Sequence, residues 1–171
     1  MNATYIVALA IALVACVTDV RNRRIPNTLT FGAALAGILF HGMTGHASGL
    51  YHSLGGWFVG AAVFFVPFAL GGLGGGDVKL LAALGAWIGP ADTAWMALYT
   101  GIAGGVLALV VAVLNGYLRQ ALSNIWLLFS HWRVVGIRPV GEISLEGSAG
   151  PRLAYAVPIL VGMLMTVWLR S

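Results

Sequence analysis

Charged residues are scarce in this sequence. Of its 171 residues, 8% are Asp, Glu, Lys or Arg, whereas 60% are hydrophobic. Soluble domains carry about 25% charged residues, so the composition argues against an aqueous globular protein. Several apolar stretches approach the roughly 20 residues that a membrane-spanning helix needs. Because lipid offers the backbone no hydrogen-bonding partners, these blocks predict an all-α membrane protein.

Cysteine is almost absent as well. Cys16 stands alone, which excludes an internal disulfide and zinc motifs built from cysteine pairs. Residues 13–16 resemble the cleavage box of a lipoprotein signal, but a signal peptide begins with a positively charged region and residues 1–4 contain no basic side chain. We therefore predict that this region is the first spanning helix and that Cys16 is a packed thiol.

The apolar blocks predict one membrane-embedded domain over residues 1–171. Six spanning segments are expected, at residues 3–19, 27–43, 51–71, 77–89, 92–114 and 153–170. The fourth covers only about 20 Å at roughly 1.5 Å per residue, so Gly89-Pro90 could be a turn or a kink in one helix over 77–114. Residues 115–152 are predicted to form a cytoplasmic or interfacial loop.

The basic residues decide between these two topologies. With six spans and the N-terminus outside, the cytoplasmic side holds Arg21, Arg23, Arg24, Lys79, Arg119, Arg133, Arg138 and Arg152. Only Arg170 then lies outside, whereas a single span over 77–114 would divide the basic residues almost evenly. Basic residues concentrate on the cytoplasmic side of membrane proteins. Six spans are therefore predicted, with Asp19 and Asp77 at cytoplasmic helix ends.

The glycine-rich stretch GGLGGGDVKL, residues 71–80, resembles a phosphate-binding loop at first sight. A P-loop ends in Gly-Lys-Ser/Thr, but here Lys79 lies between Val78 and Leu80. The dinucleotide fingerprint needs a third glycine where this sequence has Asp77. The stretch is therefore interpreted as a turn that presents Asp77, which could alternatively just cap the exposed amides of the helix that follows.

A second carboxylate, Asp19, is predicted at the same membrane depth in TDVRNRRIPN, residues 18–27. Ionisable residues at membrane depth often mark functional sites, although Asp19 could simply pair with a neighbouring arginine. Two carboxylates brought together tend to share one proton. One member can then activate water while the other protonates a leaving amine, as in aspartic proteases. The sequence alone does not show that Asp19 and Asp77 meet, since 58 positions separate them.

These two segments resemble the motifs of a known enzyme family. GGGD, residues 74–77, looks like the Gly-x-Gly-Asp signature of membrane aspartyl proteases, and residues 76–89 resemble the corresponding helix of bacterial type IV prepilin peptidases. DVRNRRIPN, residues 19–27, resembles the first aspartate segment of that family. The resemblance covers nearly the whole chain, with only a loose match over 115–152.

The resemblance implies an inner-membrane endopeptidase that cuts the leader from prepilins at the cytoplasmic face. Asp19 and Asp77 would be its catalytic pair. Gly74 and Gly76 would let the substrate backbone approach, and Lys79 matches the family's Gly-Asp-Val-Lys run without a clear role. No metal, cofactor or nucleic-acid partner is implied; the expected partners are the prepilin and the lipid bilayer.

The sequence differs from the larger members of that family in one respect. Those members carry a cytoplasmic insertion with paired cysteines and also methylate the new pilin N-terminus. Here Asn27 leads directly into the second apolar segment, as in the short form associated with tight-adherence, Flp-type pili. We therefore expect peptidase activity without methylation and without zinc.

Two other kinds of function remain compatible with the sequence. A small proton- or cation-coupled carrier could use the same carboxylates as relay groups and would tolerate changes at Gly74 and Gly76. A non-catalytic assembly protein of a pilus or secretion machine would tolerate Asp19→Asn but not changes at interfacial positions such as Trp126 or Trp132. The sequence does not predict an oligomeric state.

Overall fold

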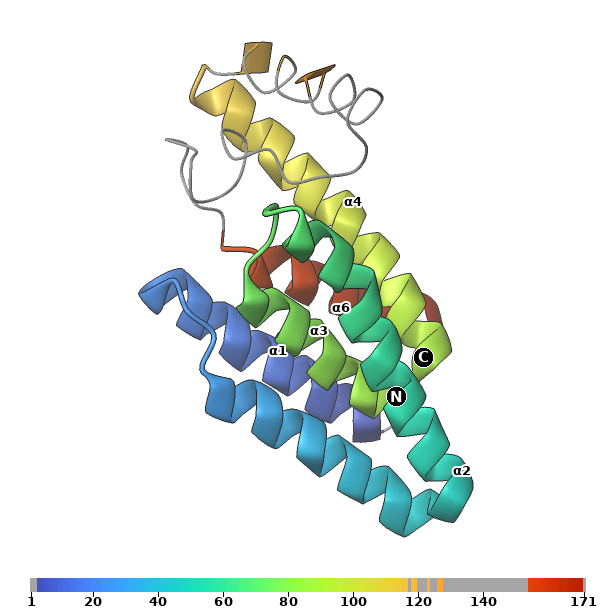
Figure 1. Ribbon diagram of the computed structural model, residues 1–171. Coiled ribbons are helices and arrows are strands. Elements are labelled where there is room, and N and C mark those ends of the chain that lie inside the picture. The colour runs from blue at the N-terminus through green and yellow to red at the C-terminus, as the bar shows by residue number, and fades with distance from the viewer. Residues whose placement is uncertain (1–2, 117, 120–122, 124–125, 128–153, 171) are drawn as a thin grey trace.

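The computed structural model is a bundle of α-helices (Figure 1). It describes residues 3–116, 118–119, 123, 126–127 and 154–170. These residues form five helices, α1 (Ala3–Asn22), α2 (Asn27–Ala69), α3 (Gly75–Ile88), α4 (Pro90–Leu114) and α6 (Ala156–Arg170). Three of them, α1, α2 and α4, are long and apolar enough to cross a membrane. The predicted class, an all-α multi-pass membrane protein, is thereby confirmed, while most of the predicted 115–152 loop lies outside the described residues.

Helix α2 joins two segments that were predicted as separate helices, 27–43 and 51–71. It changes direction at His46, whose φ of 52° and ψ of −136° are not helical, and its two halves diverge from that point (Figure 1). Gly49 permits this fold-back, because a Cβ there would lie only 3.0 Å from the carbonyl carbon of His41. A break at one residue thus takes the place of the interval between the two predicted segments. The described residues therefore do not reproduce the predicted count of six helices.

The boundary between α3 and α4 is a turn at Gly89. This residue has a φ of 80°, a conformation that glycine adopts without steric cost. Pro90 is the first residue of α4, where its missing N–H interrupts no helical hydrogen bond. Helix α4 runs back from this turn (Figure 1), so the alternative of one kinked helix over 77–114 is not observed.

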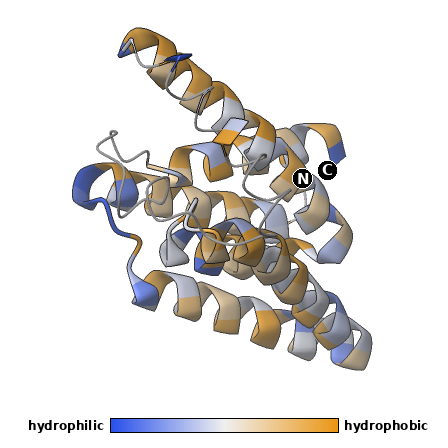
Figure 2. Cartoon of the chain, turned by 45° about the horizontal axis from the view of Figure 1, so that its top comes forward, coloured by the Kyte–Doolittle hydropathy of each residue, from blue (hydrophilic) through white to orange (hydrophobic). Residues whose placement is uncertain are grey.

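Helix α3 lies at the centre of the bundle. Every residue from 80 to 88 is buried, and α3 contacts α1, α2, α4 and α6. A helix that is apolar on all sides needs protein around its whole circumference. The surrounding helices expose apolar side chains instead, including Leu13, Leu35, Leu109 and Leu164. Figure 2 shows these apolar outer faces and a hydrophilic segment between α1 and α2.

Close backbone contact and hydrogen bonds hold α3 between the two halves of α2. A Cβ at Gly56 would lie 2.8 Å from the carbonyl carbon of Gly85, so the two backbones touch at this point. From the second half of α2, Ser53 Oγ donates to Ala86 O at 2.7 Å. On the other side, Trp87 Nε1 of α3 donates to Ala33 O at 2.9 Å. The position of α3, and of Asp77 at its start, is thus fixed from both sides.

Candidate active site

Asp19 lies in the last turn of α1, with 8% of its surface exposed. Its Oδ2 accepts a hydrogen bond at 3.3 Å from the backbone N–H of Ala156, the first residue of α6. The first N–H groups of a helix have no acceptor within the helix, which leaves this amide available. Asp19 therefore joins the end of α1 to the beginning of α6, 137 positions further along the chain.

Asp77 lies in the first turn of α3, with 9% of its surface exposed. Its Oδ2 accepts the N–H of Gly74 at 3.1 Å, and its own N–H donates to Gly74 O, also at 3.1 Å. Asp77 therefore does cap the start of α3, as the alternative interpretation of the sequence expected.

The segments that carry the two aspartates meet at one end of the bundle. A Cβ at Gly76 would lie 3.5 Å from the Cβ of Ile25, in the turn that follows α1. The structure thus brings together the two aspartate-bearing segments, which the sequence could not place relative to each other.

Lys79 connects α3 to the beginning of α2. Its Nζ donates to Asn27 Oδ1 at 3.0 Å and lies 5.4 Å from the centre of the Phe31 ring. The side chain is exposed. Lys79 therefore contacts the segment that follows the Ile-Pro-Asn turn, which gives it a packing role at the rim of the site.

The glycines before Asp77 differ in what surrounds them. A Cβ at Gly74 would lie 3.1 Å from Asp77 Oδ2, closer than most real contacts of this kind, so a side chain there would press on the carboxylate. At Gly76 the corresponding neighbours, all from Ile25, lie at ordinary contact distances of 3.5–3.8 Å. Local packing thus requires a glycine at position 74 more strongly than at 76.

Sequence reasoning did not find the contribution of α6. The group that contacts Asp19 is a backbone amide, and a backbone amide has no side-chain signature. Tyr155, immediately before Ala156, packs edge-on against Phe64 of α2 with ring centres 6.0 Å apart. The contact between Tyr155 and Phe64 is visible only in the three-dimensional structure.

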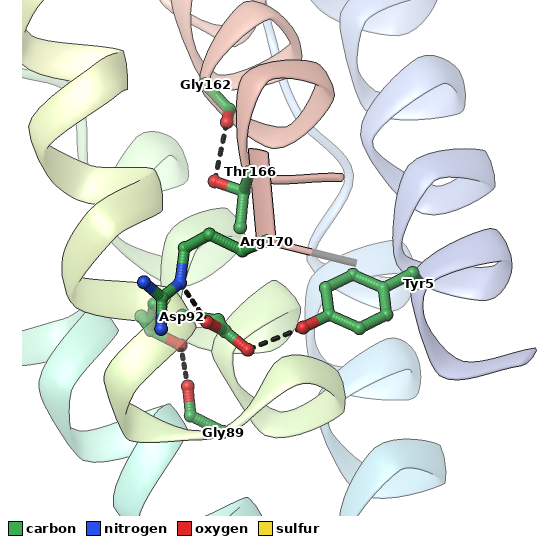
Figure 3. Close-up of polar contacts among 7 residues, drawn as sticks. Tyr5, Gly89, Asp92, Gly162, Thr166 and Arg170 are labelled. Atoms are coloured by element: carbon green, nitrogen blue, oxygen red, sulfur yellow. Dashed lines mark hydrogen bonds and ion pairs between the residues drawn. The ribbon is translucent and has the colours of Figure 1, made fainter. Parts of the chain in front are cut away.

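A second polar cluster lies at the opposite ends of the same helices (Figure 3). Asp92 Oδ2 accepts the Tyr5 hydroxyl at 2.5 Å, and Asp92 Oδ1 pairs with Arg170 Nε at 2.6 Å. Tyr5 and Asp19 are 14 residues apart on α1, which corresponds to about 21 Å of helix. This cluster therefore joins α1, α4 and α6 at a distance from the two aspartates.

The three histidines among the described residues, His41, His46 and His52, lie at or near the fold-back of α2. His41 Nε2 donates to Trp87 O at 3.0 Å, and the rings of His41 and His52 are 5.4 Å apart. Among the described residues, no group of three or more His, Cys, Asp or Glu side chains could hold a metal ion.

Comparison with known proteins identifies the family. The sequence pattern of the type IV leader peptidase family matches residues 6–109, which include both aspartates and the turn after α1. The chain belongs to the type IV leader peptidase family. Helix α6, which contributes the amide to Asp19, lies beyond the matched region.

One relative gives a measure of similarity within this family. The prepilin leader peptidase/N-methyltransferase of Pectobacterium carotovorum subsp. carotovorum is 33% identical over 143 residues, which cover 77% of this chain and 48% of that relative. The chain thus spans about half the length of the curated relative that it matches. No solved structure matches the chain.

Proposed function

We propose that this protein is a membrane aspartic endopeptidase that removes the leader peptide from type IV prepilins, with Asp19 and Asp77 as its catalytic pair. The observation that carries the proposal is that two buried carboxylates lie on segments that meet at one end of the bundle. Their segments resemble the two aspartate motifs of the type IV leader peptidases, the family to which the chain belongs.

The proposed reaction needs one carboxylate and one carboxylic acid. The carboxylate takes a proton from water, and the water oxygen bonds to the carbonyl carbon of the scissile peptide. The carboxylic acid stabilises the developing oxyanion by a hydrogen bond. When the C–N bond breaks, the carboxylic acid gives its proton to the leaving amine, while the proton taken from water stays on the other carboxyl group, so that one member of the pair is again protonated. Two carboxyl groups in one buried site suit this division, since they do not both ionise readily.

The site is proposed to face the cytoplasm, with six membrane spans and the N-terminus outside. Arg21 lies in the last turn of α1 near Asp19, and Arg23 and Arg24 follow in the hydrophilic segment between α1 and α2. Lys79 lies at the same end of the bundle, because it binds Asn27. Arg170 lies at the other end with Asp92. This distribution follows the rule that basic residues concentrate on the cytoplasmic side.

The substrate is proposed to be a prepilin of the Flp type, and the product is proposed to remain unmethylated. Helix α1 ends at Asn22 and α2 begins at Asn27, so the turn between them has no room for a cysteine-paired insertion. Gly76 supports the approach of an extended substrate backbone. The structure has space for a methyl group there, so a loss of cleavage in Gly76→Ala would report on the substrate rather than on packing.

The activity can be tested with the full chain in liposomes and a purified Flp-type prepilin. Mass spectrometry of the product, with S-adenosylmethionine present, gives both the cleavage site and the mass of the new N-terminus. We expect cleavage between the leader and the hydrophobic helix, with no added methyl group. An intact prepilin, under conditions in which a known type IV leader peptidase cuts it, would refute the proposed activity. A methylated product would refute only the restriction to peptidase activity.

A further inference from the structure

Asp19 is held by α6 rather than by its own helix. It lies in the last turn of α1, where the unpaired carbonyl groups of the helix disfavour a negative charge. The N–H of Ala156 donates to its Oδ2, from the end of α6 at which unpaired amides favour one. The direction of the Asp19 carboxylate therefore depends on where α6 begins.

The start of α6 is fixed by Tyr155. The ring of Tyr155 packs against Phe64 of α2, and its hydroxyl end lies over Gly104 of α4. A Cβ at Gly104 would come within 2.8 Å of Tyr155 Cζ and still closer to the hydroxyl oxygen. Gly104 is buried, so its missing side chain makes a notch that the tyrosine fills.

The two neighbouring glycines of α4 lack this feature. Gly101 and Gly105 are exposed, and a Cβ at either would meet no atom within 4 Å. Of the three glycines in GIAGG, residues 101–105, only Gly104 packs against a side chain of another helix or segment. Gly105→Ala is therefore a matched control for Gly104→Ala, with the same chemistry one residue away.

We propose that the Gly104–Tyr155 contact is a positioning device for Asp19. It sets the beginning of α6 so that the Ala156 amide holds the Asp19 carboxylate in the direction needed for cleavage. Tyr155 and Gly104 are positioning residues in this proposal, because they act on Asp19 through Ala156. This inference rests on the proposed peptidase activity.

The test compares five forms of the full chain in lipid nanodiscs: wild type, Gly104→Ala, Gly105→Ala, Tyr155→Ala and the double variant Gly104→Ala/Tyr155→Ala. For each form, kcat and KM for an Flp-type prepilin are measured per folded molecule, together with Tm. A displacement of about 1 Å remote from the chemistry can lower the rate by about 100-fold. We expect Gly104→Ala to lower kcat by about 10- to 100-fold, with KM little changed, and Gly105→Ala to match the wild type.

The double variant separates positioning from general damage. The three atoms nearest to a Cβ at position 104 all belong to the phenol group of Tyr155. Removing that group removes these contacts, so Gly104→Ala should cause no further loss of kcat in the Tyr155→Ala background. Such non-additivity is the signature of two residues that act through one contact.

Three results would overturn the inference while leaving the peptidase activity intact. They are equal kcat values for Gly104→Ala and Gly105→Ala, an undiminished effect of Gly104→Ala in the Tyr155→Ala background, and a lower Tm with unchanged kcat per folded molecule. If the wild type itself cleaves no prepilin, the proposed function fails and the inference fails with it.

Discussion

The substitution Gly56→Ala tests whether the position of α3 depends on backbone contact with α2. The new Cβ would lie 2.8 Å from both the carbonyl carbon of Gly85 and the Cα of Gly89. Carbon atoms pack at about 3.5–4.0 Å, so the helices would have to separate by about 1 Å. Both neighbours are backbone atoms and cannot rotate away.

The free-energy cost of separating the helices is partly offset by the higher helix propensity of alanine. Overpacking a well-packed core costs about 1–3 kcal/mol, and backbone obstacles favour the upper end of that range. Alanine is about 1 kcal/mol better than glycine inside a helix, which offsets part of the cost. We therefore expect Gly56→Ala to lower the free energy of unfolding by about 2 kcal/mol.

Gly32→Ala provides the matched control on the same helix. Gly32 is exposed, and a Cβ there would meet no atom within 4 Å, so this variant should be unchanged or up to about 1 kcal/mol more stable. The stabilities of both variants can be measured by reversible unfolding in mixed micelles, with tryptophan fluorescence as one signal and circular dichroism as the other. Equal stabilities for the two variants would refute the packing of α3 described here.

Three further predictions concern other parts of the fold. His46→Gly should raise the free energy of unfolding by about 1 kcal/mol, because His46 has a φ of 52° and glycine bears no steric cost there; a less stable variant would contradict this. Asp92→Ala should lower it, because Arg170 and the Tyr5 hydroxyl lose the carboxylate that they share, while kcat for prepilin cleavage per folded molecule stays unchanged; a fall in kcat would show that the cluster acts at the site. A double-mutant cycle between Lys79→Met and Asn27→Ala should give a coupling of about 0.5 kcal/mol, since the hydrogen bond between them is exposed; zero coupling would remove the packing role of Lys79.

The side chains proposed to carry out the reaction could be identified from the sequence. Asp19 and Asp77 stand out because carboxylates are rare in an apolar chain, and the charge pattern of the whole sequence placed them at one membrane face. In the structure, the turn that follows α1 packs against Gly76, the residue before Asp77. The turn at Gly89-Pro90 was one of two alternatives, because glycine and proline also occur at kinks.

Other features depend on contacts that no local pattern records. The Ala156 amide is a backbone group, and the importance of Gly104 over Gly101 and Gly105 depends on how α4 is rotated against α6. The change of direction at His46 was also missed, because a residue other than glycine adopts a positive φ there. All three features are decided by tertiary packing rather than by the preferences of single residues.

The central claim is that Asp19 and Asp77 act together in peptide cleavage. The most direct test is a leader-cleavage assay in membranes, comparing the wild type with Asp19→Asn, Asp77→Asn and the control Asp92→Asn, each at matched folded levels. Asparagine keeps the size of the side chain but neither ionises nor serves as an acid or base. We expect the wild type and Asp92→Asn to cut the prepilin, and neither Asp19→Asn nor Asp77→Asn to do so. Cleavage by either of these two variants would contradict the two-carboxylate mechanism.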